Sequence, residues 1–176
     1  MARIIKDPLL TASRIIITVV MVALALVGAL LVMCASYIAI DPSGLTVELL
    51  KEGIAHPDHN VVVAIIAVML LALIPIGMIL LFLHLLRLII DSVGIGDPFV
   101  PNNAVRLSRM AWLAVGVQLA SIPIGAIGAW LAQHVKDADI DIGVSMEGIA
   151  LALILFILAR VFRRGAEMRE ELEGTV

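Results

Sequence analysis

Four long apolar stretches, separated by short polar segments, occupy most of this chain. They cover residues 15–40, 61–90, 110–131 and 146–164. A helix rises about 1.5 Å per residue, so about 20 residues are needed to cross the ~30 Å hydrocarbon core of a bilayer. The fourth stretch approaches that length only by recruiting residues on both sides of its apolar run 149–162. The pattern predicts an all-α integral membrane protein with four transmembrane helices in a single domain, residues 1–176.

The composition supports lipid as the surroundings. Hydrophobic residues make up 62% of the chain and charged residues 15%, whereas soluble domains average about 45–50% and about 25%. The net charge of −3 is nearly balanced, so we expect no direct nucleic-acid binding. Cys34 is the only cysteine, which excludes an intramolecular disulfide. Lipoprotein cleavage before Cys34 is disfavoured because the preceding apolar run is longer than a signal-peptide core.

The basic residues are distributed unevenly. Ten of the twelve lysines and arginines precede the first stretch, flank the segment between the second and third, or follow the fourth: Arg3, Lys6, Arg14, Arg87, Arg106, Arg109, Arg160, Arg163, Arg164 and Arg169. The positive-inside rule then predicts that both termini are cytoplasmic. On this interpretation residues 41–60 and 133–148 are outer loops, 91–109 form a cytoplasmic elbow, and 165–176 form a cytoplasmic tail.

Helix-start signals precede three of the stretches. Asp7 before Pro8 is typical of an N-cap followed by a first helical residue. Asn102 or Asn103 is expected to cap the third helix, and Ser145 the fourth.

Two prolines lie within apolar stretches. The tetrapeptide IPIG occurs at 74–77 and 122–125, which places Pro75 and Pro123 near mid-depth. Proline removes one backbone hydrogen bond and bends a helix. The pair could act as hinges, but ordinary bending of membrane helices is the favoured interpretation.

Small and polar side chains provide candidate contacts between helices. Small residues at helical spacing allow close approach of a partner helix. We expect that partner to be another helix of the same chain, with a helix of a second copy as the alternative. The small residues are Ser121, Gly125, Gly128 and Ala129. His84 and Gln118 are expected to hydrogen-bond to neighbouring helices rather than to act as relay or ligand groups.

The outer loops contain the few candidate metal ligands. His56, Asp58 and His59 are ligand types at close spacing. Pro57 opposes chelation, and we predict no bound metal or cofactor. The first loop also predicts a short amphipathic helix on the membrane surface, with its apolar residues at Leu45, Val47, Leu49, Leu50 and Ile54. The second loop alternates at strand period over residues 139–142.

The elbow and tail form the candidate partner-binding surface. Phe99 is expected either to enter the lipid interface or to pack under the tail. The tail changes from basic to acidic along its length, with an apolar stripe at helical spacing, so the fourth helix is expected to continue into the cytoplasm, with Arg163 and Arg164 against lipid phosphates. The candidate partner-binding residues are Phe99, Arg106, Arg109, Arg163, Arg164, Glu167, Glu170, Glu171 and Leu172.

Two segments resemble a known family. GDPFVPNNAVRLSRMAWL (96–113) and LARVFRRGAEMREELEGTV (158–176) are similar to the signatures of the bacterial membrane-protein family labelled domain of unknown function 2975 (DUF2975). The matching positions are Gly96, Asp97, Pro98, Phe99, Asn103, Arg106 and Leu107 in the elbow, and Val161, Phe162, Gly165, Glu171, Leu172, Thr175 and Val176 in the tail. Many relatives have an acidic residue where this chain has Arg160. The resemblance implies a location in the bacterial inner membrane and a small helix-turn-helix regulator encoded nearby.

Three functions follow as hypotheses. The first is a non-enzymatic membrane adaptor or sensor that binds or regulates a small helix-turn-helix transcription regulator. The second is an assembly protein that forms a homo-oligomer through the small-residue face. The third is a small transporter or channel, disfavoured because the apolar cores of the four stretches (149–162 in the fourth) contain no aspartate, glutamate or lysine. No constellation of catalytic residues is evident, so we predict that the chain is not an enzyme.

Overall fold

The computed structural model consists of helices and connecting segments. It describes residues 8–51, 59–94, 99–133 and 145–173, and of Lys51, Leu172 and Glu173 it describes the backbone alone. The helices are α1 (Pro8–Ile40), α2 (Ser43–Lys51), α3 (His59–Leu71), α4 (Leu73–Gly94), α5 (Pro101–Ala132) and α6 (Met146–Glu173). The predicted all-α class is confirmed.

Three helical segments in the described part of the chain are long and apolar enough to cross a membrane: Pro8–Ile40, His59–Gly94 and Pro101–Ala132. The first has only Ile17 and Ala35 buried, and the side chain of Leu26 is 66% exposed. Contact with water over such a surface would oppose folding, whereas contact with lipid would not. The chain is therefore a membrane protein.

The α6 helix is not among these three. Only twelve residues separate Glu147 from Arg160, a rise of about 18 Å. The remainder of α6 is rich in charged residues.

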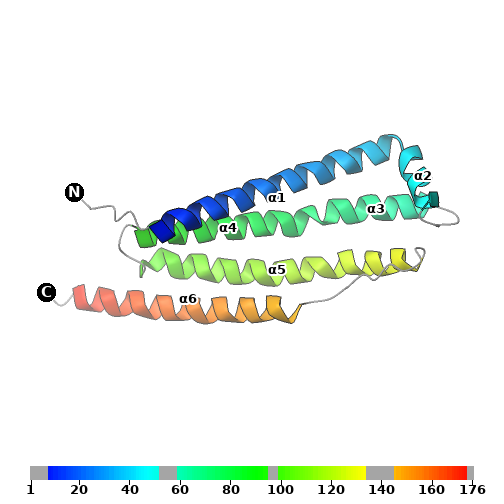
Figure 1. The fold of residues 1–176 in the computed structure, drawn as a ribbon. Helices are drawn as coiled ribbons and strands as arrows, with labels where there is room; N and C mark the ends of the chain where they lie inside the picture. The colour runs from blue at the N-terminus through cyan, green and yellow to red at the C-terminus, as the bar shows by residue number, and fades with distance from the viewer. Residues whose placement is uncertain (1–7, 52–58, 95–98, 134–144, 174–176) are drawn as a thin grey trace.

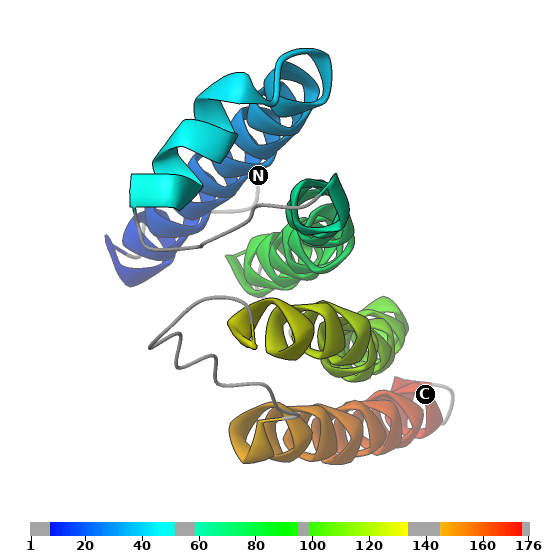
Figure 2. The same cartoon turned by 90° about the vertical axis from the view of Figure 1, so that its right-hand side faces the viewer.

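The helices lie side by side in one open row rather than in a closed bundle (Figures 1 and 2). Along the row the order is α1, then α3 with α4, then α5, then α6, and α6 packs chiefly against α5. Along the direction of the helix axes, the start of α1 and the end of α6 lie at the same end of the helix layer (Figure 1). We call this the arginine-rich end, because Arg14, Arg87, Arg106, Arg109, Arg160, Arg163, Arg164 and Arg169 lie in the helical turns nearest to it.

The two prolines behave differently. The second apolar segment is interrupted at Ala72, three residues before Pro75, and this divides it into α3 and α4. Proline cannot donate a hydrogen bond to the carbonyl four residues earlier, here that of Leu71, which explains the break. Pro123 lies inside α5, which continues through it. Whether either site moves stays a prediction.

The helix starts confirm one of the three predicted caps, correct another and leave the third untested. The α1 helix begins at Pro8, while Asp7 lies outside the described residues. At α6 the backbone N–H of Gly148 donates to Ser145 Oγ at 3.1 Å, so Ser145 is the N-cap. The expected cap of the third helix was wrong: Val100 is the N-cap of α5, without a side-chain hydrogen bond. Asn103 is instead turned inward.

The predicted surface helix of the first loop corresponds to α2. Asp41 starts it by accepting hydrogen bonds from the Ser43 hydroxyl at 2.5 Å and the Ser43 backbone N–H at 3.0 Å. These two bonds hold the pKa of Asp41 below its ordinary value. Ile54 and the alternating segment 139–142 lie outside the described residues.

The main hydrophobic core lies between α4, α5 and α6. Ala152, Ala159 and Ala166 recur every seven residues on α6, and each is at most 5% exposed. They lie opposite a similar row on α5, made of Ala104, Leu107, Ala111 and Ala114. A seven-residue repeat of small side chains lets two helices approach closely along a continuous line. This α5–α6 seam is the most extensive helix contact in the structure.

A polar contact determines where α6 begins along α5. Gln118, near the middle of α5, donates through Nε2 to the Ser145 backbone carbonyl at 3.0 Å and to Ser145 Oγ at 2.9 Å. Its Oε1 accepts from the Ser145 backbone N–H at 3.3 Å. The prediction that Gln118 bonds to a neighbouring helix is confirmed. As a result α6 lies beside the first half of α5 and extends past its start (Figure 1).

Gly148 is the position that tests this contact. A Cβ added there would overlap the amide nitrogen of Gln118, while one added at Gly77 would meet nothing within 4 Å. We expect Gly148→Ala to displace the Gln118 amide and lower the free energy of unfolding by about 1–3 kcal/mol, because polar groups lose partners in apolar surroundings. Gly77→Ala should be neutral or slightly stabilising.

Helix content during thermal unfolding in detergent measures both variants. The decisive comparison is a double variant: in a Gln118→Ala background, Gly148→Ala should cost much less. Equal costs in the two backgrounds would show that Gln118 does not constrain Gly148.

Candidate functional site

The α4 and α5 helices are joined at the arginine-rich end by a buried polar network. Asn103 is fully buried, and its Nδ2 donates to Ser92 Oγ at 2.6 Å. Arg106 Nη1 donates to Asn103 Oδ1 at 2.9 Å and to the Leu88 carbonyl at 3.1 Å. Ser92 in turn donates to the Ile89 carbonyl at 2.7 Å. The network joins the last turns of α4 to the first turns of α5 and forms a corner between the two helices.

Phe99 connects this corner to α6. Its ring lies 5.2 Å from that of Phe162, measured between centroids. It also lies against Gly165, where an added Cβ would come within 2.8 Å of Phe99 Cδ1. Of the two alternatives raised by the sequence, the structure therefore has Phe99 packing on the tail helix.

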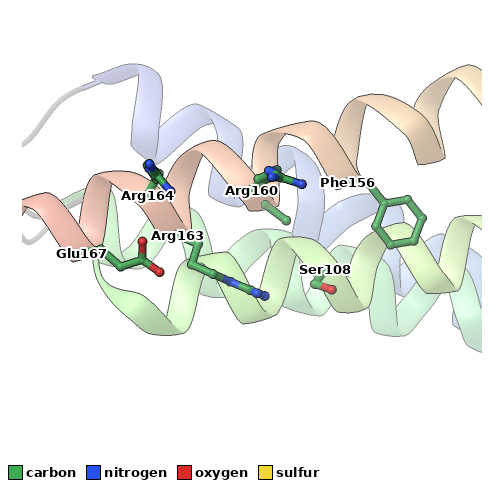
Figure 3. A pocket seen from close by; sticks show the side chains of 7 residues that line it. Ser108, Phe156, Arg160, Arg163, Arg164 and Glu167 are labelled. Atoms are coloured by element: carbon green, nitrogen blue, oxygen red, sulfur yellow. The ribbon is translucent and has the colours of Figure 1, made fainter.

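A groove runs along the α5–α6 seam at the arginine-rich end. Two hollows of about 380 and 290 Å³ share Arg163 and Glu167, and together they follow one line along both helices. The larger, shown in Figure 3, is lined by Ser108 on α5 and by Phe156, Ala159, Arg160, Arg163, Arg164 and Glu167 on α6. We call it the arginine groove. Phe156 lies at one end, Glu167 at the other, and Arg163 extends toward Ser108 (Figure 3).

The arginines near this end differ in their partners. Arg14 forms an ion pair with Asp91, Nε to Oδ1 at 2.7 Å, and ties α1 to α4. Arg106 belongs to the elbow network. Across residues 8–51, 59–94, 99–133 and 145–173, by contrast, no carboxylate lies within 4.0 Å of the three exposed guanidinium groups of the arginine groove. Their charge is available to a ligand.

Beyond the groove α6 becomes acidic. Glu167, Glu170 and Glu171 are exposed, while Ala166 beside them is buried against α5. Because Ala166 and Glu170 lie beside Pro101 at the first turn of α5, the last turn of α6, which ends at Glu173, projects past the other helices (Figure 1).

The predicted partner-binding residues therefore separate into different roles. Phe99 and Arg106 hold the elbow together, and Arg109 is an exposed side chain on α5. Arg163 and Arg164 line the groove with Glu167, Glu170 lies beside Pro101, and Glu171 begins the turn that projects past it. Of Leu172 the structure describes the backbone alone, so its predicted role stays untested.

The other candidate sites have these positions. His56 and Asp58 lie outside the described residues, His59 is the exposed first residue of α3, and the described part of the chain contains no group of three or more metal-ligand side chains. Gly125 and Gly128 are buried within the single chain, and Ser121 and Ala129 are partly buried. This favours packing within the chain over packing with a second copy.

The expectation that His84 forms a hydrogen bond to a neighbouring helix is not met. His84 is exposed on α4 and makes no hydrogen bond to another described residue. The sequence interpretation also missed the alanines of the seam and the inward-facing Asn103. The seven-residue spacing of Ala152, Ala159 and Ala166 was the signal available for the seam.

Substitution of Asn103 tests the polar network between α4 and α5. Asn103→Ala leaves the partners of a fully buried amide unsatisfied, so we expect the free energy of unfolding to fall by about 1–3 kcal/mol. The neighbouring Asn102 is exposed, and Asn102→Ala should stay within about 0.5 kcal/mol of the unmodified chain. Titration of folded protein with denaturing detergent measures both. Equal effects at the two positions would contradict the assigned network.

Comparison with known proteins identifies the family but not an activity. The model of the family described as "Protein of unknown function (DUF2975)" matches residues 45–176. This range covers the helices that form the elbow, the arginine groove and the acidic end of α6. No curated protein and no solved structure matches the chain. Three-quarters of the chain, including the whole candidate site, thus matches one family, and the protein is a member of the DUF2975 family.

Proposed function

We propose that this protein is a membrane adaptor that binds a small, basic helix-turn-helix regulator at the acidic end of α6. The observation that carries the proposal is the position of this acidic end: the exposed Glu170 lies beside Pro101 at the start of α5, and the last turn of α6 projects past it. The resemblance of the elbow and tail to DUF2975 implies a regulator of this type.

The proposal includes the orientation of the chain. Ten of the twelve basic residues of the sequence precede the first apolar helix, flank the elbow or follow the α6 apolar run, and the positive-inside rule assigns these parts to the cytoplasm. We infer that α6, together with residues that precede it, completes a fourth crossing and that both termini are cytoplasmic, in a bacterial inner membrane. A regulator in the cytoplasm then has direct access to the projecting turn.

Charge complementarity supports this choice of partner. DNA-binding domains carry a positively charged surface that contacts phosphates. The exposed carboxylates of Glu170 and Glu171 offer an alternative partner for that surface. An adaptor of this kind would hold the regulator away from DNA, and a change that weakens the docking would release it.

The alternative functions gain no specific support. Self-association through the small-residue face would need Gly125 and Gly128, which are already buried within one chain. For transport, the polar groups beside the apolar hollow between α4, α5 and α6 are Gln118 and Ser145, and these bond to each other. Both functions stay hypotheses.

Binding to a purified regulator tests the adaptor function. The tagged, detergent-solubilised chain is first used to capture a small helix-turn-helix protein from the cells that produce it, and the dissociation constant of the purified pair is then measured. We expect the double variant Glu170→Gln, Glu171→Gln to bind about tenfold more weakly, because two exposed charge pairs are lost.

The matched control is Glu48→Gln with Glu147→Gln. It removes the same charge at two exposed positions on other parts of the helix layer and should leave binding unchanged. If no helix-turn-helix protein is captured, or if the two double variants bind equally well, the adaptor function is wrong.

A further inference from the structure

Ser108 is unusual among the hydroxyl side chains of the structure. Hydroxyl groups within helices commonly donate to a carbonyl of the preceding turn, and Ser13, Thr18 and Ser121 all do so at 2.7–2.8 Å. Among the described residues, Ser108 is the one serine or threonine whose hydroxyl group makes no hydrogen bond. It is half-buried and faces the arginine groove. A free hydroxyl at this position is a donor for a ligand in the groove.

The groove carries an excess of positive charge. Arg160, Arg163 and Arg164 line it, against one carboxylate from Glu167. Guanidinium groups bind phosphate oxygens through paired N–H donors. Together with Ser108 on the opposite wall, Arg163 can hold a phosphate group from two helices. The ligand chemistry that fits these donors is an anionic phosphate ester.

The far end of the groove is apolar. Phe156 lines it there and makes an edge-to-face contact with Trp112, with ring centroids 5.4 Å apart. The Trp112 side chain is nevertheless 65% exposed. Tryptophan is enriched at the level of lipid headgroups, where its ring contacts both acyl chains and polar groups. The groove thus changes from basic to aromatic in the direction in which a phospholipid changes from headgroup to acyl chain.

From this arrangement we propose that the arginine groove binds the headgroup phosphate of an anionic phospholipid. Ser108 and Arg163 contact the phosphate oxygens, Arg160 and Arg164 supply further positive charge, and the acyl chains pass Phe156 and Trp112. A zwitterionic headgroup would place its ammonium beside these arginines and is disfavoured. A free phosphate ion would leave the aromatic end without a role. This site is separate from the regulator docking proposed at Glu170 and Glu171.

Quenching of tryptophan fluorescence by brominated lipid tests the site. The chain has two tryptophans, so the full-length variant Trp130→Phe leaves Trp112 as the single reporter. It is reconstituted into phosphatidylcholine vesicles that contain increasing fractions of brominated phosphatidylglycerol, or brominated phosphatidylcholine for comparison. We expect Trp112 to be quenched at a lower fraction of brominated phosphatidylglycerol than of brominated phosphatidylcholine.

Three substitutions in this background locate the preference. Arg163→Gln should reduce it about fivefold and Ser108→Ala about threefold, the latter without a change of charge. Arg109 is an exposed arginine next to Ser108 in sequence that does not line the groove, and Arg109→Gln should reduce the preference less than about twofold. Helix content and thermal unfolding of each variant show that the fold is retained.

The same measurement distinguishes a lipid from a free phosphate ion. Inorganic phosphate, compared with chloride at equal ionic strength, should leave the quenching unchanged if the site takes a lipid. Abolition of the preference by phosphate alone would overturn the lipid assignment. No preference for phosphatidylglycerol, or equal losses in Arg163→Gln and Arg109→Gln, would overturn the site itself.

Discussion

The position of α6 along α5 is the constraint on which the candidate site depends. Two contacts set it: the hydrogen bonds between Gln118 and Ser145 at one end of the seam, and the packing of Phe99 on Phe162 and Gly165 at the other. Alanines at seven-residue spacing bring the two helices together between these ends. A shift of α6 by one helical turn toward the far end of α5 would separate Ser108 from Arg163. It would also place the acidic last turn of α6, which now projects, alongside α5.

This construction suits a helix layer in lipid. Apolar side chains gain little by leaving lipid for another helix, so packing of small residues and a few hydrogen bonds hold the helices together. The α1 helix illustrates the consequence, because it is mostly exposed and is tied to α4 at its start by the ion pair between Arg14 and Asp91. The polar groups that join helices are buried or paired, whereas Arg160, Arg163 and Arg164 line one groove without a carboxylate partner among the described residues. The residues that hold the helices together thus differ from those proposed to bind a ligand.

Hydropathy predicted the long helices because it measures the preference of side chains for apolar surroundings over water, and these helices are long, continuous apolar segments. The expected stretches 15–40, 61–90 and 110–131 lie within α1, α3 with α4, and α5, and Ser145 caps α6 as predicted. The packing of one helix against another was harder to predict from the sequence, because it depends on which side chains face each other. Asn103 has the residue type and position of a cap, yet α4 lies beside it and Ser92 offers a buried partner. Likewise, the free Ser108 and its arginines come together only once the position of α6 along α5 is known.

Cysteine crosslinking in membranes tests that position most directly. In a Cys34→Ala background, cysteines replace Leu119 and Ile149, which line one small hollow between α5 and α6. A second pair replaces Ile127 and Ile149, with residue 127 about 12 Å further along α5 at about 1.5 Å per residue. The account predicts rapid crosslinking of the first pair and little of the second. Preferential crosslinking of the second pair would mean that α6 lies alongside the far half of α5, and the arginine groove as described would not exist.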